Sequence, residues 1–206
     1  RVKNNLQIIN SLLSLQGRKL KDPAAIAVLD DARSRINALS LIHSSLYEHN
    51  NIRSVEAKSF FSQLAANLAN AVGAEDRAFR IVANIDDETI DADVAVPLAL
   101  FTAEAVTNAA KHAFADFTPG GAGLIEISYR IGEDATVLTI QDNGAPYTGA
   151  VGTSSSVGAT LMTAFAKQVR GKMEEDTFPA GGRSVRIRIL AADRIPYVES
   201  DVIRAY

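Results

Sequence analysis

The segment Glu104-Ala-Val-Thr-Asn108-Ala-Ala-Lys111-His112 carries four polar side chains inside a helix that is otherwise apolar. The surrounding pattern predicts this helix over residues 91–114. Glu104, Asn108 and His112 recur every four residues, so a helix aligns them in one stripe, with Lys111 beside it. One interpretation is a solvated stripe on a surface helix. The apolar residues on the other sides leave the helix little surface to expose, and burying polar groups without partners is costly, so we favour a polar site.

A second polar position is predicted at the end of a strand. Residues 135–141 alternate as a strand that runs into Asp142, where a carboxylate could accept a hydrogen bond from an amine, and Gly144 allows a close turn. The loop 144–156 is rich in Gly, Ser and Thr and long for a compact domain, which is typical of a functional lid. Gly158 then opens a helix whose first turn suits phosphate. Each signal is common alone, but their order along the chain is much more specific.

The second half of the chain alternates short strands with helices. The strands are predicted at 79–85, 124–131, 135–141, 172–176 and 184–190. The helices are predicted at 55–72, 91–114 and 157–169. We expect an antiparallel or mixed sheet with the helices on one face, an α/β sandwich that forms one domain over residues 53–190. The tail 191–206 has no clear period.

The N-terminal part predicts two helices. Apolar residues are spaced by three, four and seven, as in a coiled-coil seam, at Val2, Leu6, Ile9, Leu13 and Leu20. Asp22 followed by Pro23 begins a second heptad helix, so residues 1–52 form an antiparallel hairpin. Further apolar residues lie off the seam, and a second copy would bury them as a four-helix bundle, giving a homodimer. A monomer that covers the hairpin with its tail is the alternative.

Composition excludes several classes of function. The 206 residues can bury a core, and a net charge of −3 gives no basic surface for nucleic acid. The absence of cysteine excludes disulfides and thiolate chemistry, and the three histidines are too few for a histidine-rich metal site. No apolar stretch approaches the roughly 20 residues of a membrane span. Because Arg1 already lies inside a helical pattern, we expect a cytoplasmic fragment of a longer protein, without membrane contact of its own.

These features together resemble the ATP-binding domain shared by histidine kinases, gyrase B, Hsp90 and MutL, the GHKL or Bergerat type. The opening segment, Arg1-Val-Lys-Asn-Asn-Leu through Gln16, resembles the phosphotransfer segment of the HWE/HisKA_2 subgroup of sensor histidine kinases. In that subgroup a histidine directly precedes Arg-x-Lys-Asn-Asn. Ser34-Arg35-Ile36 and Ala95-Val96-Pro97-Leu98 fit the same subgroup. The resemblance covers roughly residues 1–190 and implies an α+β protein, a helical hairpin followed by a sandwich that binds ATP.

The resemblance also implies roles for single residues. Asn108 would hold Mg²⁺ between the ATP phosphates, and Glu104 would sit near the metal or activate the attacking imidazole. Asp142 would bind the adenine amine in a pocket that Gly144 shapes. The other nucleotide-binding positions would be Lys111, His112, Ser156, Gly158 and Thr160. The phosphoacceptor histidine would come just before Arg1, and Asn4, one turn later, could orient water in a phosphatase reaction.

The implied function is the core of a two-component sensor histidine kinase. It would transfer the γ-phosphoryl group of Mg-ATP to the histidine and then to an aspartate in the receiver domain of a response regulator. Departures from the family pattern at Ala145-Pro146, Ala159 and Arg183 leave open a degenerate, phosphatase-biased or phosphotransfer scaffold with weak or no ATP binding. A third alternative, an ATPase or serine kinase of the same superfamily, would lack the heptad hairpin. We interpret His43 as structural and His49 as an exposed loop residue.

Overall fold

The computed structural model of the chain describes residues 2–22, 25–26, 28–29, 32–33, 35–36, 39–40, 54–74, 79–114, 123–146 and 157–195. His43, His49, Ser156 and most of the predicted lid lie outside these ranges, as does the side chain of Asn4. Within them, no helix is both long and apolar enough to cross a membrane.

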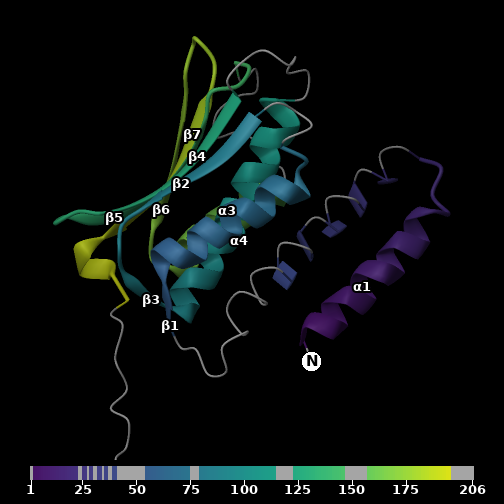
Figure 1. Ribbon diagram of the computed structural model, residues 1–206, viewed down its shortest axis with the longest axis horizontal. Coiled ribbons are helices and arrows are strands. Elements are labelled where there is room, and N and C mark those ends of the chain that lie inside the picture. The colour runs from purple at the N-terminus through teal and green to yellow at the C-terminus, as the bar shows by residue number, and fades with distance from the viewer. Residues whose placement is uncertain are drawn as a thin grey trace, which may run out of the picture.

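A five-stranded sheet organises the second half of the chain (Figure 1). Its strands, in spatial order, are β2 (Phe79–Ile85), β4 (Gly123–Ile131), β5 (Ala135–Asp142), β7 (Arg183–Leu190) and β6 (Lys172–Thr177). Only the β2–β4 pair is parallel, so the prediction of a mixed sheet is confirmed. Alternate residues of β4 are buried, as expected for a sheet with one covered face.

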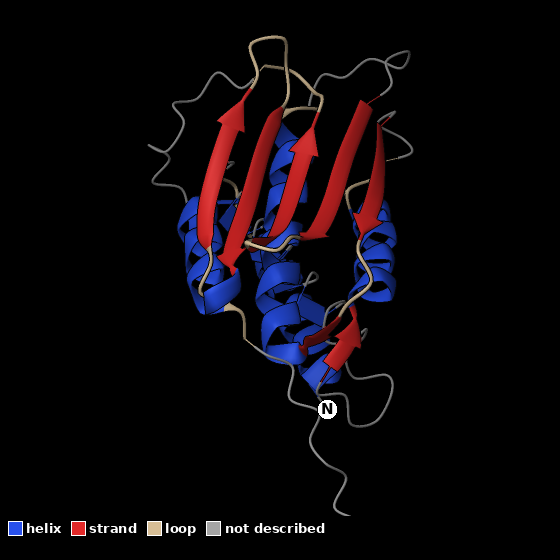
Figure 2. Cartoon of the chain, turned by 90° about the vertical axis from the view of Figure 1, so that its left-hand side faces the viewer, coloured by secondary structure: helices blue, strands red, loops and turns tan. Residues whose placement is uncertain are grey.

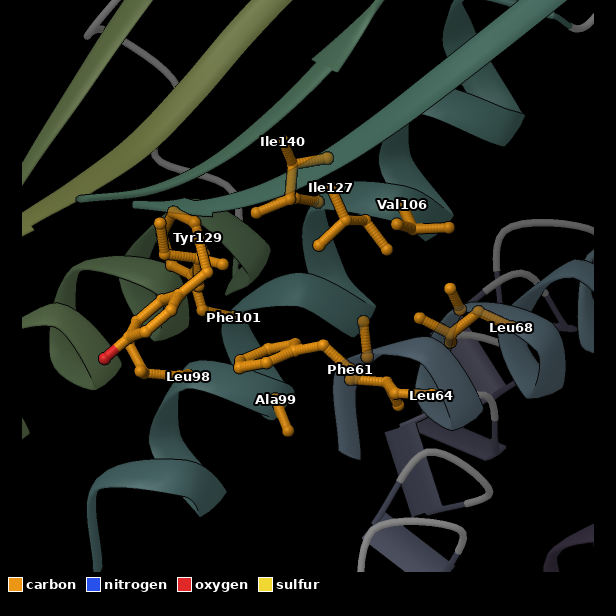
Figure 3. Packing of buried hydrophobic residues seen from close by; sticks show 14 of the residues in the cluster. Phe61, Leu64, Leu68, Leu98, Ala99, Phe101, Val106, Ile127, Tyr129 and Ile140 are labelled. Atoms are coloured by element: carbon orange, nitrogen blue, oxygen red, sulfur yellow. The ribbon is translucent and has the colours of Figure 1, made fainter. Parts of the chain in front are cut away.

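Three helices cover that face: α3 (Ala57–Ala71), α4 (Ala92–His112) and α5 (Val157–Gln168). Figure 2 shows the strands in front and these helices behind them. The core lies between the two layers, where Phe61 of α3 stacks on Tyr129 of β4 with ring centroids 5.8 Å apart (Figure 3). Leu98 and Phe101 of α4 are fully buried in the same cluster. This packing makes α4 the central helix, so its polar stripe is held on a rigid element.

Two short strands were not predicted. β1 (Ser54–Glu56) pairs antiparallel with β3 (Thr89–Asp91) in a separate two-stranded sheet. The prediction that a helix begins at residue 55 was therefore wrong, because α3 begins at Ala57, whose N–H donates to the Glu88 carbonyl (2.8 Å). Strands of three residues are too short to show a period, and their pairing joins distant segments. The tail begins with a short 3-10 helix, η1 (Ala191–Asp193).

Residues 2–17 and the described residues between 25 and 40 are helical, as predicted. α1 (Val2–Gly17) is followed by a second helical stretch among the described residues between 25 and 40, which runs back beside α1 (Figure 1). The Ile26 N–H donates to the Asp22 carbonyl (3.0 Å), the hydrogen bond expected if Asp22 precedes the first turn of this helix. A Cβ added to Gly17 would lie 2.9 Å from Leu29, so the helices approach closely near the turn. α1 lies on the side of the helix layer away from the sheet.

Candidate functional site

The stripe on α4 runs from the buried interior to the surface. α4 begins after Asp91, whose side chain caps the helix by accepting the Asp93 N–H (2.8 Å). Glu104 is buried and Asn108 is half-buried, whereas Lys111 and His112, one turn further on, are exposed. The interpretation of the whole stripe as a solvated surface therefore fails at Glu104.

One cavity, which we call the strand cavity, lies between the C-terminal half of α4 and the end of β5. It has a volume of about 140 Å³ and is lined by Asn108, Ala109, His112, Ala113, Asp142, Ala145, Pro146 and Arg183. Three of the predicted site residues, Asn108, His112 and Asp142, thus meet although they come from two separate elements.

A close approach of two backbones positions Asp142. The Gly144 N–H donates to the Asp142 carboxylate (3.0 Å), and the Ala145 N–H donates to the Ala113 carbonyl at the end of α4 (2.9 Å). A Cβ added to Gly144 would lie 2.5 Å from both the Cβ and the carbonyl oxygen of Ala113. Only glycine allows this contact, which fastens the end of β5 to the end of α4.

Asp142 is only 6% exposed. Burial raises the pKa of its carboxyl group, and the Gly144 N–H, the Arg183 charge and the Arg183 backbone N–H oppose that rise. Arg183 in turn pairs with Glu175 (2.7 Å). The sequence marked Arg183 as a departure from the family pattern but did not place it in the site. The register of β5 against β7 does so, because it sets Arg183 opposite Asp142.

A second cavity, the hairpin cavity, is also lined by Asn108. It has a volume of about 250 Å³ and is lined by Arg35, Ile36, Leu39, Leu100, Ala103, Glu104, Thr107, Asn108, Lys111, Leu161 and Phe165. Its residues come from the second hairpin helix, α4 and α5. Asn108 lines both cavities, so the two spaces have this residue in common.

Inside the hairpin cavity the Glu104 carboxylate is paired with Arg35. The Arg35 Nε donates to one carboxylate oxygen and Nη2 to the other, the latter at 3.5 Å. Gly158, in the first turn of α5, lies against the same carboxylate, since an added Cβ would be 3.1 Å from Glu104 Oε2 and 3.6 Å from Asn108 Nδ2. The sequence did not predict Arg35 as a site residue, and nothing in its local pattern points to this contact.

Three predicted site residues are not placed in either cavity. Thr160 is exposed on α5 and lines neither cavity, while Ser156 and the side chain of Asn4 lie outside the described residues. The described part of the chain contains no cluster of three His, Cys, Asp or Glu side chains that could hold a metal. The oxygens of Glu104 and Asn108 suit Mg²⁺, which commonly takes one or two protein ligands and completes its shell with phosphates and water.

Comparisons with known proteins bear on the whole chain. The HisKA_2 histidine kinase family matches residues 1–72. The chain is 28% identical over 195 residues to the sensor histidine kinase PdtaS of Mycolicibacterium smegmatis, covering 92% of this chain and 38% of that protein. It is 27% identical over 146 residues to the blue-light-activated histidine kinase 2 of Erythrobacter litoralis, covering 70% of this chain and 41% of that protein. The chain thus spans about two fifths of the length of these curated relatives.

The fold has a counterpart among solved structures. The histidine kinase domain of the Erythrobacter litoralis EL346 blue-light activated histidine kinase matches with a TM-score of 0.65, over 89% of this chain and 95% of that domain. Because the identity is only 15%, this match is evidence for the fold alone. Residues 1–72 thus match the HisKA_2 histidine kinase family, the chain is similar to sensor histidine kinases, and its fold is that of a histidine kinase domain.

Proposed function

We propose that this chain is the ATP-binding and phosphotransfer core of a two-component sensor histidine kinase. Residues 1–52 would act as the dimerisation and phosphotransfer hairpin, residues 53–190 as the GHKL-type ATP-binding domain, and residues 191–206 as a tail. The observation that carries the proposal is that Asn108 lines two cavities. The strand cavity contains a buried carboxylate suited to the adenine base, and the hairpin cavity contains groups suited to phosphates and Mg²⁺.

The strand cavity would take the adenine. The Asp142 carboxylate could accept a hydrogen bond from the exocyclic amine, and the close turn at Gly144 would let a flat ring approach the backbone. Arg183 supports this role because its positive charge favours the ionised form of Asp142 against the effect of burial.

The phosphates would extend past Asn108 into the hairpin cavity. The Asn108 side-chain oxygen would coordinate Mg²⁺, with Glu104 near the metal, and Lys111 and the first turn of α5 at Gly158 would face the phosphates. When bound, the metal would neutralise charge on the transferring phosphoryl group. The protein would contribute mainly by positioning the two reactants.

The phosphoryl group would pass to a histidine just before Arg1 and then to an aspartate of a response-regulator receiver domain. The exposed apolar face of α1, which includes Ile8, Leu12 and Leu15, supports a homodimer in which two hairpins form a four-helix bundle. Neither nucleic acid nor a membrane is among the partners that we propose for this part of the protein.

The direct test is labelling with γ-labelled ATP, in the chain extended at its N-terminus by a histidine before Arg1. We expect the label on that histidine, and we expect Asn108→Ala to abolish it while far-UV circular dichroism is unchanged. Asn84→Ala is the matched control, because Asn84 is exposed on the edge strand β2, away from both cavities. Undiminished labelling in Asn108→Ala would refute the role proposed for Asn108.

A second candidate is a phosphatase-biased or phosphotransfer scaffold with weak or no ATP binding. It is favoured by Ala145, Pro146 and Arg183, which depart from the family pattern and all line the strand cavity. Calorimetric titration with ATP and Mg²⁺ separates the two candidates. Tight binding removes the scaffold, and no binding removes the kinase.

A further inference from the structure

The ion pair between Arg35 and Glu104 joins the hairpin to the ATP-binding domain. The two residues are 69 positions apart in the sequence, and both nitrogens of the contact face the two oxygens of one carboxylate. The Glu104 side chain is 10% exposed and that of Arg35 is 31% exposed. A carboxylate this deeply buried requires a partner, and Arg35 is the partner that the hairpin supplies.

The pair lies at the end of the site where the phosphates would be placed. A Cβ added to Gly158 would have three nearest neighbours, Glu104 Oε2, Asn108 Nδ2 and, at 3.7 Å, Arg35 Nη2. Lys111 lines the same cavity. The Glu104 carboxylate therefore lies between an arginine and the first turn of a helix, in a cavity that a lysine also lines, and all three kinds of group can bind anions.

We propose that Arg35 senses the γ-phosphate of bound ATP by exchanging partners. In the nucleotide-free chain Glu104 holds Arg35, and when Mg-ATP binds at Asn108 the γ-phosphate oxygens replace the carboxylate. A planar guanidinium accepts either partner, since it binds carboxylate and phosphate in the same forked geometry. The exchange leaves Glu104 available to the metal or the attacking imidazole. This inference rests on the proposed function.

The surrounding packing allows such an exchange. Arg35 belongs to the hairpin, and the space between the hairpin and α4 and α5 is a cavity of about 250 Å³ with largely apolar walls, such as Leu39, Leu161 and Phe165. Protein interiors are normally close-packed, so a contact that leaves this much space permits the hairpin helix to shift. The γ-phosphate would keep the guanidinium paired, and the Mg²⁺ near Glu104 would take the place of Arg35, so neither charge would be left buried and alone, which is the costly step. The position of the hairpin would thus depend on whether a γ-phosphate is bound.

Titration calorimetry with Mg-ATP and Mg-ADP tests the exchange. ADP lacks the γ-phosphate, so the ratio of the two affinities reports the Arg35 contact. The gain from the contact with the γ-phosphate is partly offset by loss of the Glu104 contact, so Arg35→Met should lower the ratio about tenfold. Arg35→Lys should lie between Arg35→Met and the wild type. Arg18→Met is the control, because Arg18 is exposed at the hairpin turn.

Hydrogen exchange on the wild type gives a second measurement that does not depend on a variant that folds. A non-hydrolysable ATP analogue with Mg²⁺ should change amide exchange around Arg35, and Mg-ADP should not. The inference is overturned if the ratio of the ATP and ADP affinities is unchanged in Arg35→Met. It is also overturned if the analogue and ADP have equal effects on amide hydrogen exchange. Either result leaves the kinase proposal standing. If the wild type binds neither nucleotide, the proposed function itself fails.

Discussion

Replacing Asp142 by asparagine should weaken the binding of the adenine base without lowering the stability of the fold. The substitution keeps the shape of the side chain and one acceptor for the Gly144 N–H, which lies 3.0 Å from the carboxylate. It removes the negative charge that the adenine amine would meet. A hydrogen bond to a charged group is worth about 1.5–3 kcal/mol, so we expect ATP to bind about 10- to 150-fold more weakly to Asp142→Asn.

Stability should respond in the opposite sense. Burial raises the pKa of Asp142 above its ordinary value, so the folded chain holds a proton on this group more tightly than the unfolded chain does. At neutral pH the ionised carboxylate therefore subtracts from the free energy of unfolding, and this loss is recovered as the pH falls through the raised pKa. We expect Asp142→Asn to melt at the same temperature as the wild type or higher at neutral pH, with the difference shrinking in acid.

Two assays check these expectations. Calorimetric titration with Mg-ATP measures the affinity, and thermal unfolding over a range of pH measures stability. Asp87→Asn is the matched control, because Asp87 is exposed and makes only a surface ion pair with Lys58 (3.8 Å). Unchanged ATP affinity in Asp142→Asn would refute the assignment of the strand cavity to the base. A marked fall in melting temperature would refute the reasoning about burial.

Three further substitutions probe the core, the turn and the hairpin. Phe61→Ala removes a fully buried ring stacked on Tyr129 and should cost about 3–5 kcal/mol in urea unfolding; a loss below about 1 kcal/mol would contradict the packing. Gly144→Ala puts a Cβ 2.5 Å from the Ala113 backbone oxygen, so it should lower the free energy of unfolding by about 1–3 kcal/mol and weaken ATP binding. Unchanged stability would contradict this close contact. Leu12→Glu charges an apolar residue that is 55% exposed, so sedimentation should find monomers where the wild type forms dimers. An unchanged sedimentation profile would count against a dimer through α1.

The long periodic elements could be predicted from the sequence because their patterns are local. α4 was expected over 91–114 and runs from Ala92 to His112, and the strand before Asp142 differs from its prediction by one residue. β1 and β3 could not be predicted, since each has three residues and their pairing depends on segments far apart.

The same reasoning applies to the site. Glu104, Asn108 and Asp142 stand out in sequence because polar residues are unusual in an apolar helix or at the end of a strand. The contacts of Arg35 and Arg183 with the site could not be predicted, because arginine is common on surfaces. Their positions depend on how the hairpin packs on α4 and on the register of β5 against β7, which are tertiary properties.

The central claim is that the two cavities lined by Asn108 together form an Mg-ATP site. A crystal structure of the chain with a non-hydrolysable ATP analogue and Mg²⁺ tests it most directly. We predict the adenine amine within hydrogen-bonding distance of Asp142, the metal at the Asn108 side-chain oxygen, and the γ-phosphate in contact with Arg35. A nucleotide bound elsewhere, or two empty cavities at saturating analogue, would contradict the claim.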